Sequence, residues 1–225
     1  AALCKAGAIE RVEEGQTGGV YAVRTESRSR KLAVFKPDEE ERFERRGTPC
    51  GGGAAREEAA YLLDRLAGAF ARVPVTTRAR VPVWTLTAEA MAAEAMAAEE
   101  QVGENRISGS VQSYVLEVEG SSEEFGMPRA LAAAAQIVPI ELAQHVASLD
   151  IRLCNTDRHA GNLLFQKNVA GGFTLVPIDH GCTLPRWWAM GEACFDAWAR
   201  WPQVSAPCVP EVLEVIETAF ACQDR

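Results

Sequence analysis

The chain has 225 residues, of which 48% are hydrophobic, so it can bury a sizeable core as one bilobal domain or two small ones. Its formal charge of -8 argues against nucleic acid as the main partner, because that binding requires cations that neutralise phosphates, and against simple electrostatic adsorption to anionic lipid. The seven scattered cysteines include no CxxC pair, which indicates a reducing, cytoplasmic setting rather than a disulfide framework or a zinc ribbon.

No segment contains the roughly 18 uninterrupted apolar residues that a membrane-spanning helix needs. The most apolar stretch, residues 131–149, is broken by polar residues and by Pro139, which indicates a buried helix. We therefore expect any membrane contact to be peripheral. Because the sequence starts with neither an initiator Met nor a secretory signal, we expect it to be a fragment of a longer protein.

The N-terminal part predicts strands followed by one helix. Residues 12–36 predict a strand pair, in which a glycine-rich turn, Gly15–Gly19, precedes the β-prone run Val20–Val23, and Pro37 ends the second strand. A charged and then glycine-rich connector follows. It leads to a helix at about 54–70, where apolar residues recur every three or four positions.

The middle of the chain alternates between extended and helical patterns. Residues 72–86 predict extended structure, which their prolines limit to short or edge strands. The Met/Ala/Glu repeat at 88–100 predicts an inserted surface helix or a loop, to which we assign no function. Residues 108–120 predict a strand-like connector between lobes. An alanine-rich helical segment at 129–138 then leads to a helix at 139–152 that opens on its proline.

The C-terminal part predicts a polar loop, a hairpin at 162–179 and a tryptophan-rich region that closes with a helix near 210–221. Strands with one helix come first and helices second, which indicates an α+β fold with two lobes, similar to a protein kinase. We expect a single domain with a small β-rich N-lobe and hinge at about 1–115 and a helical C-lobe at about 116–225.

The polar loop carries the first candidate chemistry. Asp157 and Asn162 are five positions apart, as are the catalytic Asp and the metal-binding Asn of a protein-kinase catalytic loop. That chemistry needs a carboxylate at the substrate hydroxyl and a carboxamide that holds Mg²⁺ a few residues on. The alternative is a solvated, capped loop in which Asn155 or Asp157 is a helix cap.

A second acidic motif ends the predicted hairpin. Asp179 follows a β-prone run and stands two residues before Gly181, which matches the kinase D-x-G element whose Asp binds Mg²⁺. Such a motif alone is more often a plain turn. The hairpin between Asn162 and Asp179 would bring the two metal ligands together.

An early lysine is the candidate cation for phosphates. Strand periodicity places Leu32, Val34 and Lys36 on one face, where a lysine is unfavourable unless an anion lies near it. The alternative is a lysine at a strand end that reaches water. Glu57 and Glu58 of the predicted helix could pair with this lysine, and the helical phase mildly favours Glu58.

Two rival interpretations of the polar residues remain, and the glycine-rich segment taken alone is by default a hairpin turn. One rival is a hydrolase acid pair, Asp157 with Asp179, which leaves the Lys36 strand and the glycine turn without a role. The other is a zinc site made of four residues, Cys154, His159, His180 and Cys182. The late tryptophans could touch a membrane interface, although core packing is favoured; they are Trp187, Trp188, Trp198 and Trp201.

Taken together, these motifs resemble a known family. The segments "NTDRHAGN" and "LVPIDHG" resemble the catalytic core of phosphatidylinositol 3-/4-kinases, most of all the type II phosphatidylinositol 4-kinases of the plant and algal gamma group. The segments "LAVFKP", "REEAAYLLD" and "SVQSYV" occur in the same order as in that family. The resemblance covers most of the chain.

The resemblance implies how ATP would be bound. Lys36 would bind the α/β-phosphates beneath the glycine turn, and Glu57 would be its partner, against the preference of the helical phase. The glycines of that turn are Gly18 and Gly19. The hinge that offers backbone groups to adenine would be Gln112, Ser113, Tyr114 and Val115.

The same resemblance implies the chemistry. Asp157 would be the catalytic acid/base, Arg158 and His159 would shape its loop, and Asn162 and Asp179 would hold Mg²⁺ or Mn²⁺. The expected reaction transfers the ATP γ-phosphate to the inositol 4-hydroxyl of phosphatidylinositol at a cytosolic membrane face. The alternatives are a Ser/Thr protein kinase with a protein substrate on the same scaffold, or a non-catalytic nucleotide-binding module.

Overall fold

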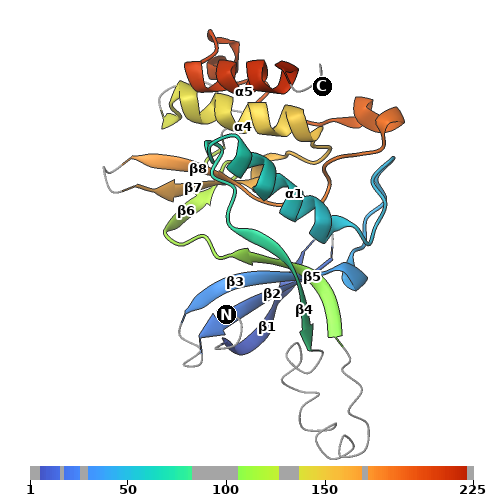
Figure 1. The fold of residues 1–225 in the computed structure, drawn as a ribbon. Coiled ribbons are helices and arrows are strands. Elements are labelled where there is room, and N and C mark those ends of the chain that lie inside the picture. The colour runs from blue at the N-terminus through green and yellow to red at the C-terminus, as the bar shows by residue number, and fades with distance from the viewer. Residues whose placement is uncertain are drawn as a thin grey trace, which may run out of the picture. The chain divides into compact units, whose positions relative to one another are not determined.

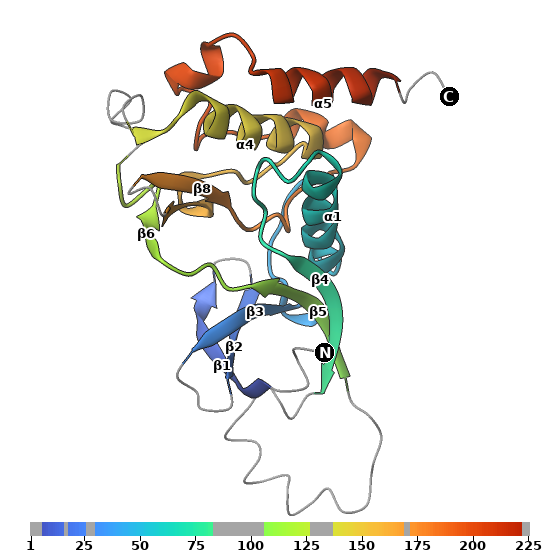
Figure 2. The same cartoon turned by 60° about the vertical axis from the view of Figure 1, so that its left-hand side comes forward.

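The computed structural model describes residues 6–15, 18–25, 30–82, 106–126, 137–168 and 172–221 (Figures 1 and 2). The repeat at 88–100 and nearly all of the alanine-rich segment at 129–138 lie outside these residues. The chain divides into two compact units. Unit 1 comprises 1–45, 49–58 and 75–114, and unit 2 comprises 46–48, 59–74 and 115–225.

Unit 1 is built on a five-stranded antiparallel sheet. Its order is β1-β2-β3-β5-β4, and the strands are β1 (Ala6–Gly15), β2 (Gly18–Thr25), β3 (Lys31–Pro37), β4 (Thr76–Pro82) and β5 (Arg106–Ser113). Phe35 pairs with Tyr21 on one side and Val111 on the other, so apolar side chains align across the strands and form the core of this unit. The length of β1 was not predicted.

The two faces of β3 differ in burial. Ala33, Phe35 and Pro37 are buried, whereas the face with Val34 and Lys36 is only partly buried. The predicted Lys36 face is therefore the more exposed of the two, with Leu32 exposed at its start. Because side chains alternate along a strand, the packing of Phe35 dictates that Lys36 points the other way.

Helix α1 (Gly53–Leu66) begins where the acidic connector caps it. Glu41 accepts hydrogen bonds from the backbone N–H groups of Gly51 and Gly53, both at 2.7 Å, and Asp38 accepts from Ala54 N at 3.3 Å. Carboxylates at a helix N-terminus satisfy its unpaired N–H groups and interact favourably with its dipole. Desolvation nevertheless raises the pKa of Glu41. The connector, including η2 (Asp38–Glu40), therefore positions the start of the helix.

The end of α1 lies in unit 2 and comes earlier than predicted. Ala69 adopts a left-handed conformation with φ 60°, and its N–H donates to Asp64 O at 2.7 Å. The Asp64 carboxylate accepts from the N–H groups of Ala71 and Val73, both at 2.9 Å. These bonds fold the chain back at Leu66, whereas apolar periodicity had extended the helix to Phe70.

Unit 2 combines a small sheet with helices. The antiparallel sheet has the order β6-β7-β8, made of β6 (Val118–Ser121), β7 (Leu163–Lys167) and β8 (Phe173–Pro177), and the β7–β8 hairpin confirms the sequence prediction. The helices are α4 (Ile140–Leu153) and α5 (Pro210–Ala221), with 3-10 turns η4 (Ala160–Asn162), η5 (Trp187–Glu192) and η6 (Pro202–Ser205). In both views α5 runs over α4 (Figures 1 and 2).

Two of the four late tryptophans are buried in the core of unit 2. Trp198 and Trp201 are buried with α4 and with Leu163 and Phe165 of β7. Trp187, in contrast, is 81% exposed. The packing interpretation therefore holds for only half of this group. Among the described residues, no helix is both long and apolar enough to cross a membrane.

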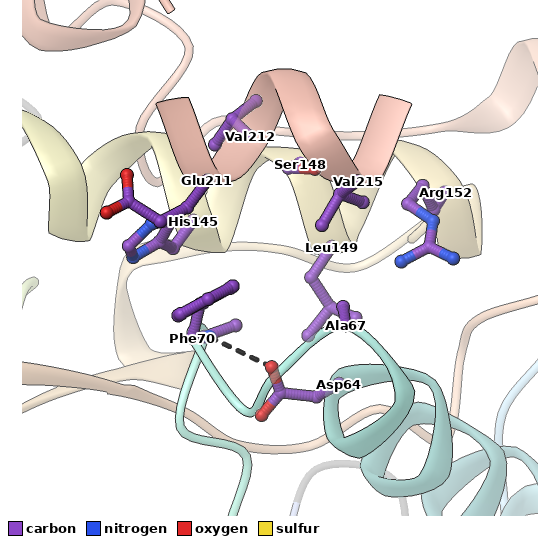
Figure 3. A pocket seen from close by; sticks show the side chains of 11 residues that line it. Asp64, Ala67, Phe70, His145, Ser148, Leu149, Arg152, Glu211, Val212 and Val215 are labelled. Atoms are coloured by element: carbon purple, nitrogen blue, oxygen red, sulfur yellow. Dashed lines mark hydrogen bonds between the residues drawn. The ribbon is translucent and has the colours of Figure 1, made fainter. Parts of the chain in front are cut away.

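A shallow pocket lies in unit 2 where the end of α1 meets α4 and α5 (Figure 3). His145 of α4 stacks on Phe70 with ring centroids 5.1 Å apart. Burial lowers the pKa of His145, although the charges of Glu211, Glu141 and Asp64 oppose that shift and Arg72 adds to it. None of the site residues predicted from sequence lines this pocket.

This burial predicts a pH dependence of stability. Because the pKa of His145 is lower in the folded chain, the unfolded chain binds a proton first as the pH falls below the ordinary value of 6.5. Folding stability should therefore decline from pH 7 to pH 5.5. His145→Phe keeps an aromatic ring on Phe70 and should show a smaller decline in urea unfolding. Equal declines in the two proteins would refute the role of His145.

Candidate active site

Unit 1 contains a lysine–carboxylate pair. Lys36 Nζ on β3 lies 2.7 Å from Glu57 Oε1 in the first turns of α1, and Glu57 is only 2% exposed. Glu58 accepts instead from Arg78 Nε at 2.7 Å and from Thr77 Oγ1 at 2.9 Å. The partner of Lys36 is therefore Glu57, and the preference of the helical phase for Glu58 was wrong.

The phase argument failed because α1 does not present one apolar face to one surface. Its leucines lie beyond residue 58 and belong to unit 2, whereas Glu57 belongs to unit 1. A periodicity fitted to the later turns does not describe the packing of the first turns.

The glycine turn has a packing explanation. Gly18 has φ 154°, and a Cβ there would lie 2.6 Å from Glu40 O, while a Cβ on Gly19 would clash with the Glu40 carboxylate. Tyr21 OH donates to that carboxylate at 2.6 Å. Glycine is therefore required at Gly18, where the backbone of Glu40 leaves no room for a side chain, and at Gly19 it lets the Glu40 carboxylate pack against the turn.

The predicted hinge lies at the end of β5. Gln112 is buried and donates to Thr76 Oγ1 at 3.0 Å. The N–H groups of Ser113 and Tyr114 donate to Val75 O and Leu32 O, at 2.8 and 3.0 Å. These two amides are therefore already engaged by hydrogen bonds within the protein.

In unit 2 the polar loop is ordered by its own hydrogen bonds. Asp157 N donates to Asn155 Oδ1 at 2.9 Å, and Asn162 Nδ2 donates to Asp157 O at 3.1 Å. Gly161 N donates to His159 Nδ1 at 3.1 Å. Asn155 thus orders the loop locally, but the residue that caps the following 3-10 turn is His159 rather than Asn155 or Asp157, which the alternative interpretation had named.

A fully buried arginine joins this loop to the segment that carries Asp179. Arg158 Nε lies 2.9 Å from Asp150 Oδ2 on α4, and both side chains are 0% exposed. Arg158 Nη1 donates to Asn162 O at 2.5 Å and to Ile178 O at 2.8 Å. One guanidinium group therefore fixes the peptide at Asn162 and the peptide that leads into Asp179.

Two further contacts strengthen this connection. Ile178 N donates to Asn162 O at 3.1 Å. Arg158 Nη2 lies 3.0 Å from His180 Nε2, and His180 is buried. Both flanking residues of Asp179 are thus held, and Asp179 itself adopts the left-handed conformation with φ 57°. Such strained backbone persists only where its surroundings fix it.

Asp150 is a site residue that sequence reasoning missed. Besides Arg158, its carboxylate accepts from Asn155 Nδ2 at 2.9 Å and from Trp198 Nε1 at 2.8 Å. A signal was present, because Asp150 lies three or four positions from Val146, Ala147 and Leu153 on the buried side of α4. An acid on that side needs a buried partner.

The donor atoms fit a hard divalent cation. Asn162 and Asp179 supply oxygen atoms, and Mg²⁺ is commonly bound by one or two protein oxygens with water and substrate phosphates completing its shell. Among the described residues, no three His, Cys, Asp or Glu side chains form a metal-binding group. The zinc alternative is therefore wrong. His180, one of its four residues, contacts Arg158 instead.

The predicted site residues therefore fall into two sets. Unit 2 brings together the polar loop and the segment that leads into Asp179, and unit 1 brings together Lys36 with Glu57. Phosphoryl-transfer enzymes use the same kinds of residue: a lysine paired with a buried carboxylate, a loop that carries an aspartate, and a second aspartate at the end of a strand.

Comparison with known proteins identifies the family. Residues 24–207 match the family model described as phosphatidylinositol 3- and 4-kinase, so the chain belongs to that family. Phosphatidylinositol 4-kinase gamma 4 of Oryza sativa subsp. japonica is 35% identical, over 92% of this chain and 36% of its own length. The Arabidopsis thaliana protein of the same name is 34% identical, over 95% of this chain and 38% of its own length.

The chain spans a little over a third of the length of these curated relatives. Among solved structures, the Helicobacter pylori proinflammatory kinase CtkA matches 78% of this chain and 59% of its own, with a TM-score of 0.46 and 15% identity.

The buried arginine predicts a large effect on stability. Arg158→Met should lower the free energy of unfolding by about 3–5 kcal/mol, because it leaves the Asp150 carboxylate buried without its cation. Arg46→Met is the matched control, since the Arg46–Glu192 pair is exposed and should contribute about 1 kcal/mol or less. Urea unfolding measures both.

A double variant separates charge burial from lost packing. Asp150→Asn with Arg158→Met removes both charges and should recover part of the loss, because no uncompensated ion remains. If Arg158→Met and Arg46→Met destabilised the chain equally, the proposed importance of the buried pair would be refuted.

Proposed function

We propose that this chain is the catalytic domain of a phosphatidylinositol 4-kinase, which transfers the γ-phosphate of ATP to the inositol 4-hydroxyl. The observation that carries this proposal is the match of residues 24–207 to the phosphatidylinositol 3- and 4-kinase family, in a chain that keeps the reactive side chains of its motifs. Those side chains are Lys36, Glu57, Asp157, Asn162 and Asp179.

Lys36 neutralises the phosphates of ATP in this proposal. Its ion pair with Glu57 holds the ammonium group at a defined position on β3, so little side-chain entropy is lost when a phosphate binds. Glu57 acts through Lys36 and is a positioning residue.

The glycine turn imposes a condition on nucleotide binding. The Glu40 carboxylate packs against Gly18 and Gly19, and a triphosphate close to these backbone N–H groups would meet a like charge. We infer that Glu40 and its Tyr21 partner move away when nucleotide occupies the turn. Gln112, Ser113, Tyr114 and Val115 would then form the adenine-binding hinge.

The polar loop supplies the transfer chemistry. Asn162 and Asp179 would hold Mg²⁺ or Mn²⁺, which when bound neutralises charge on the transferring phosphoryl group. Asp157 accepts the proton of the acceptor hydroxyl as its oxygen bonds to the γ-phosphorus and the bond to ADP breaks. Arg158 and His159 position this loop, Arg158 through its bonds to Asp150 and to the two loop peptides.

Phosphatidylinositol is the proposed acceptor because the curated relatives carry the name phosphatidylinositol 4-kinase. The lipid would be reached by peripheral contact at the cytosolic face of a membrane. A Ser/Thr protein acceptor is the runner-up from the sequence.

The test supplies labelled ATP and Mg²⁺ with either phosphatidylinositol vesicles or a mixture of protein substrates. We expect label in the lipid, and Asp157→Asn should reduce its rate by about 10²–10⁴-fold, because a general base contributes roughly that factor. Asp179→Asn should reduce it similarly. Glu58→Gln is the matched control and should retain the rate, since Glu58 binds Arg78 rather than Lys36.

The outcomes separate the alternatives. Label found in protein alone would replace the lipid acceptor with a protein acceptor. Undiminished transfer by Asp157→Asn would overturn its catalytic role. Binding of ATP without transfer to any acceptor would favour a non-catalytic nucleotide-binding module.

A further inference from the structure

An exposed apolar surface follows the Asp179 segment in unit 2. Of the large hydrophobic side chains that are exposed in the described residues, four fall within seven positions of the chain, and Trp187 is 81% exposed. We call these four the η5 patch; they are Leu184, Trp187, Trp188 and Met190. Exposed apolar residues that stand alone are ordinary, but four so close together in the chain, two of them tryptophans, indicate an interaction surface.

The backbone of the η5 patch is held in place by contacts with neighbouring segments. Ala189 is the buried residue of η5, and a Cβ on Gly47 would clash with its methyl group. Arg186 N donates to Gly47 O at 2.8 Å, and Leu184 N donates to Leu153 O at 2.7 Å. The backbone that carries the exposed tryptophans is therefore already ordered, so binding a partner would cost little additional conformational entropy.

Basic side chains flank the η5 patch. Arg186 is exposed immediately before Trp187, and the Arg46 guanidinium lies 5.7 Å from the centre of the Trp188 ring. Arg46 also pairs with Glu192 at 3.0 Å, which offsets part of its charge. Tryptophan with arginine beside it suits the headgroup region of a bilayer, where the indole ring is partly buried and the cation meets lipid phosphate.

We propose that the η5 patch is the element that seats this chain on the surface of a phospholipid bilayer containing anionic lipid. The proposal rests on the proposed function, because an acceptor that is itself a membrane lipid requires contact with a bilayer. The patch begins five residues after Asp179, so the same segment carries the proposed metal ligand and the membrane contact.

Apolar insertion, rather than overall charge, must supply most of this binding. The chain carries a formal charge of -8, which opposes adsorption to an anionic surface, so two arginines can orient the patch but cannot drive attachment. Insertion of an indole ring removes a large apolar area from water. Binding should therefore persist at high salt, which separates this surface from an electrostatic one.

The test is co-sedimentation of the 225-residue chain with sucrose-loaded vesicles of phosphatidylcholine with phosphatidylserine. Trp187→Ser should lower the partition coefficient by at least about tenfold, and Trp187→Phe should restore most of it. Leu66→Ser is the matched control, since Leu66 is 85% exposed on α1 and outside the patch, and it should bind as the parent chain does. Quenching of tryptophan fluorescence by brominated lipid should fall in Trp187→Ser.

The activity readout distinguishes failure of this inference from failure of the proposed function. Trp187→Ser should lose transfer to phosphatidylinositol in vesicles but retain it on a short-chain, monomeric phosphatidylinositol. Equal vesicle binding by the parent chain and Trp187→Ser, or no binding by the parent chain, would overturn the inference. If vesicle binding depends on Trp187 but the chain transfers no phosphate to lipid, only the proposed function would be overturned.

Discussion

The buried Arg158–Asp150 pair is the interaction on which the candidate site depends. Burying two charges is costly, and the cost is offset only where every polar atom of the pair finds a partner. Here the carboxylate also accepts from Asn155 and Trp198, and the guanidinium also reaches two backbone carbonyls. A group that requires so many partners at once fixes the backbone around it.

That constraint explains how two motifs that are separate in the sequence are held together in unit 2. The loop with Asp157 and Asn162 and the segment with Asp179 are joined through Arg158 and through the bond from Ile178 N to Asn162 O. The left-handed backbone at Asp179 lies next to these anchors. If Asn162 and Asp179 bind a cation as proposed, a backbone held in this way would reduce the rearrangement that binding requires, which suits a phosphoryl-transfer site.

Much of the architecture could be predicted because it follows local rules. The β7–β8 hairpin, the proline that opens α4 and the extent of α5 all rest on short-range patterns. The remainder depended on contacts between distant residues. The choice of Glu57 over Glu58, the capping of α1 by Glu41 and the role of Asp150 arise from packing that periodicity does not encode. The family resemblance selected Glu57 where the helical phase selected its neighbour.

The central claim is that this preorganised pair of loops binds ATP through a divalent cation. Calorimetric titration with a non-hydrolysable ATP analogue tests it most directly, with Mg²⁺ present and after its removal by EDTA. The account predicts binding that requires Mg²⁺ and that Asp179→Asn weakens by about tenfold or more, while Asp196→Asn, at an exposed position, leaves it unchanged. Equal affinity with and without Mg²⁺, or in Asp179→Asn, would contradict it.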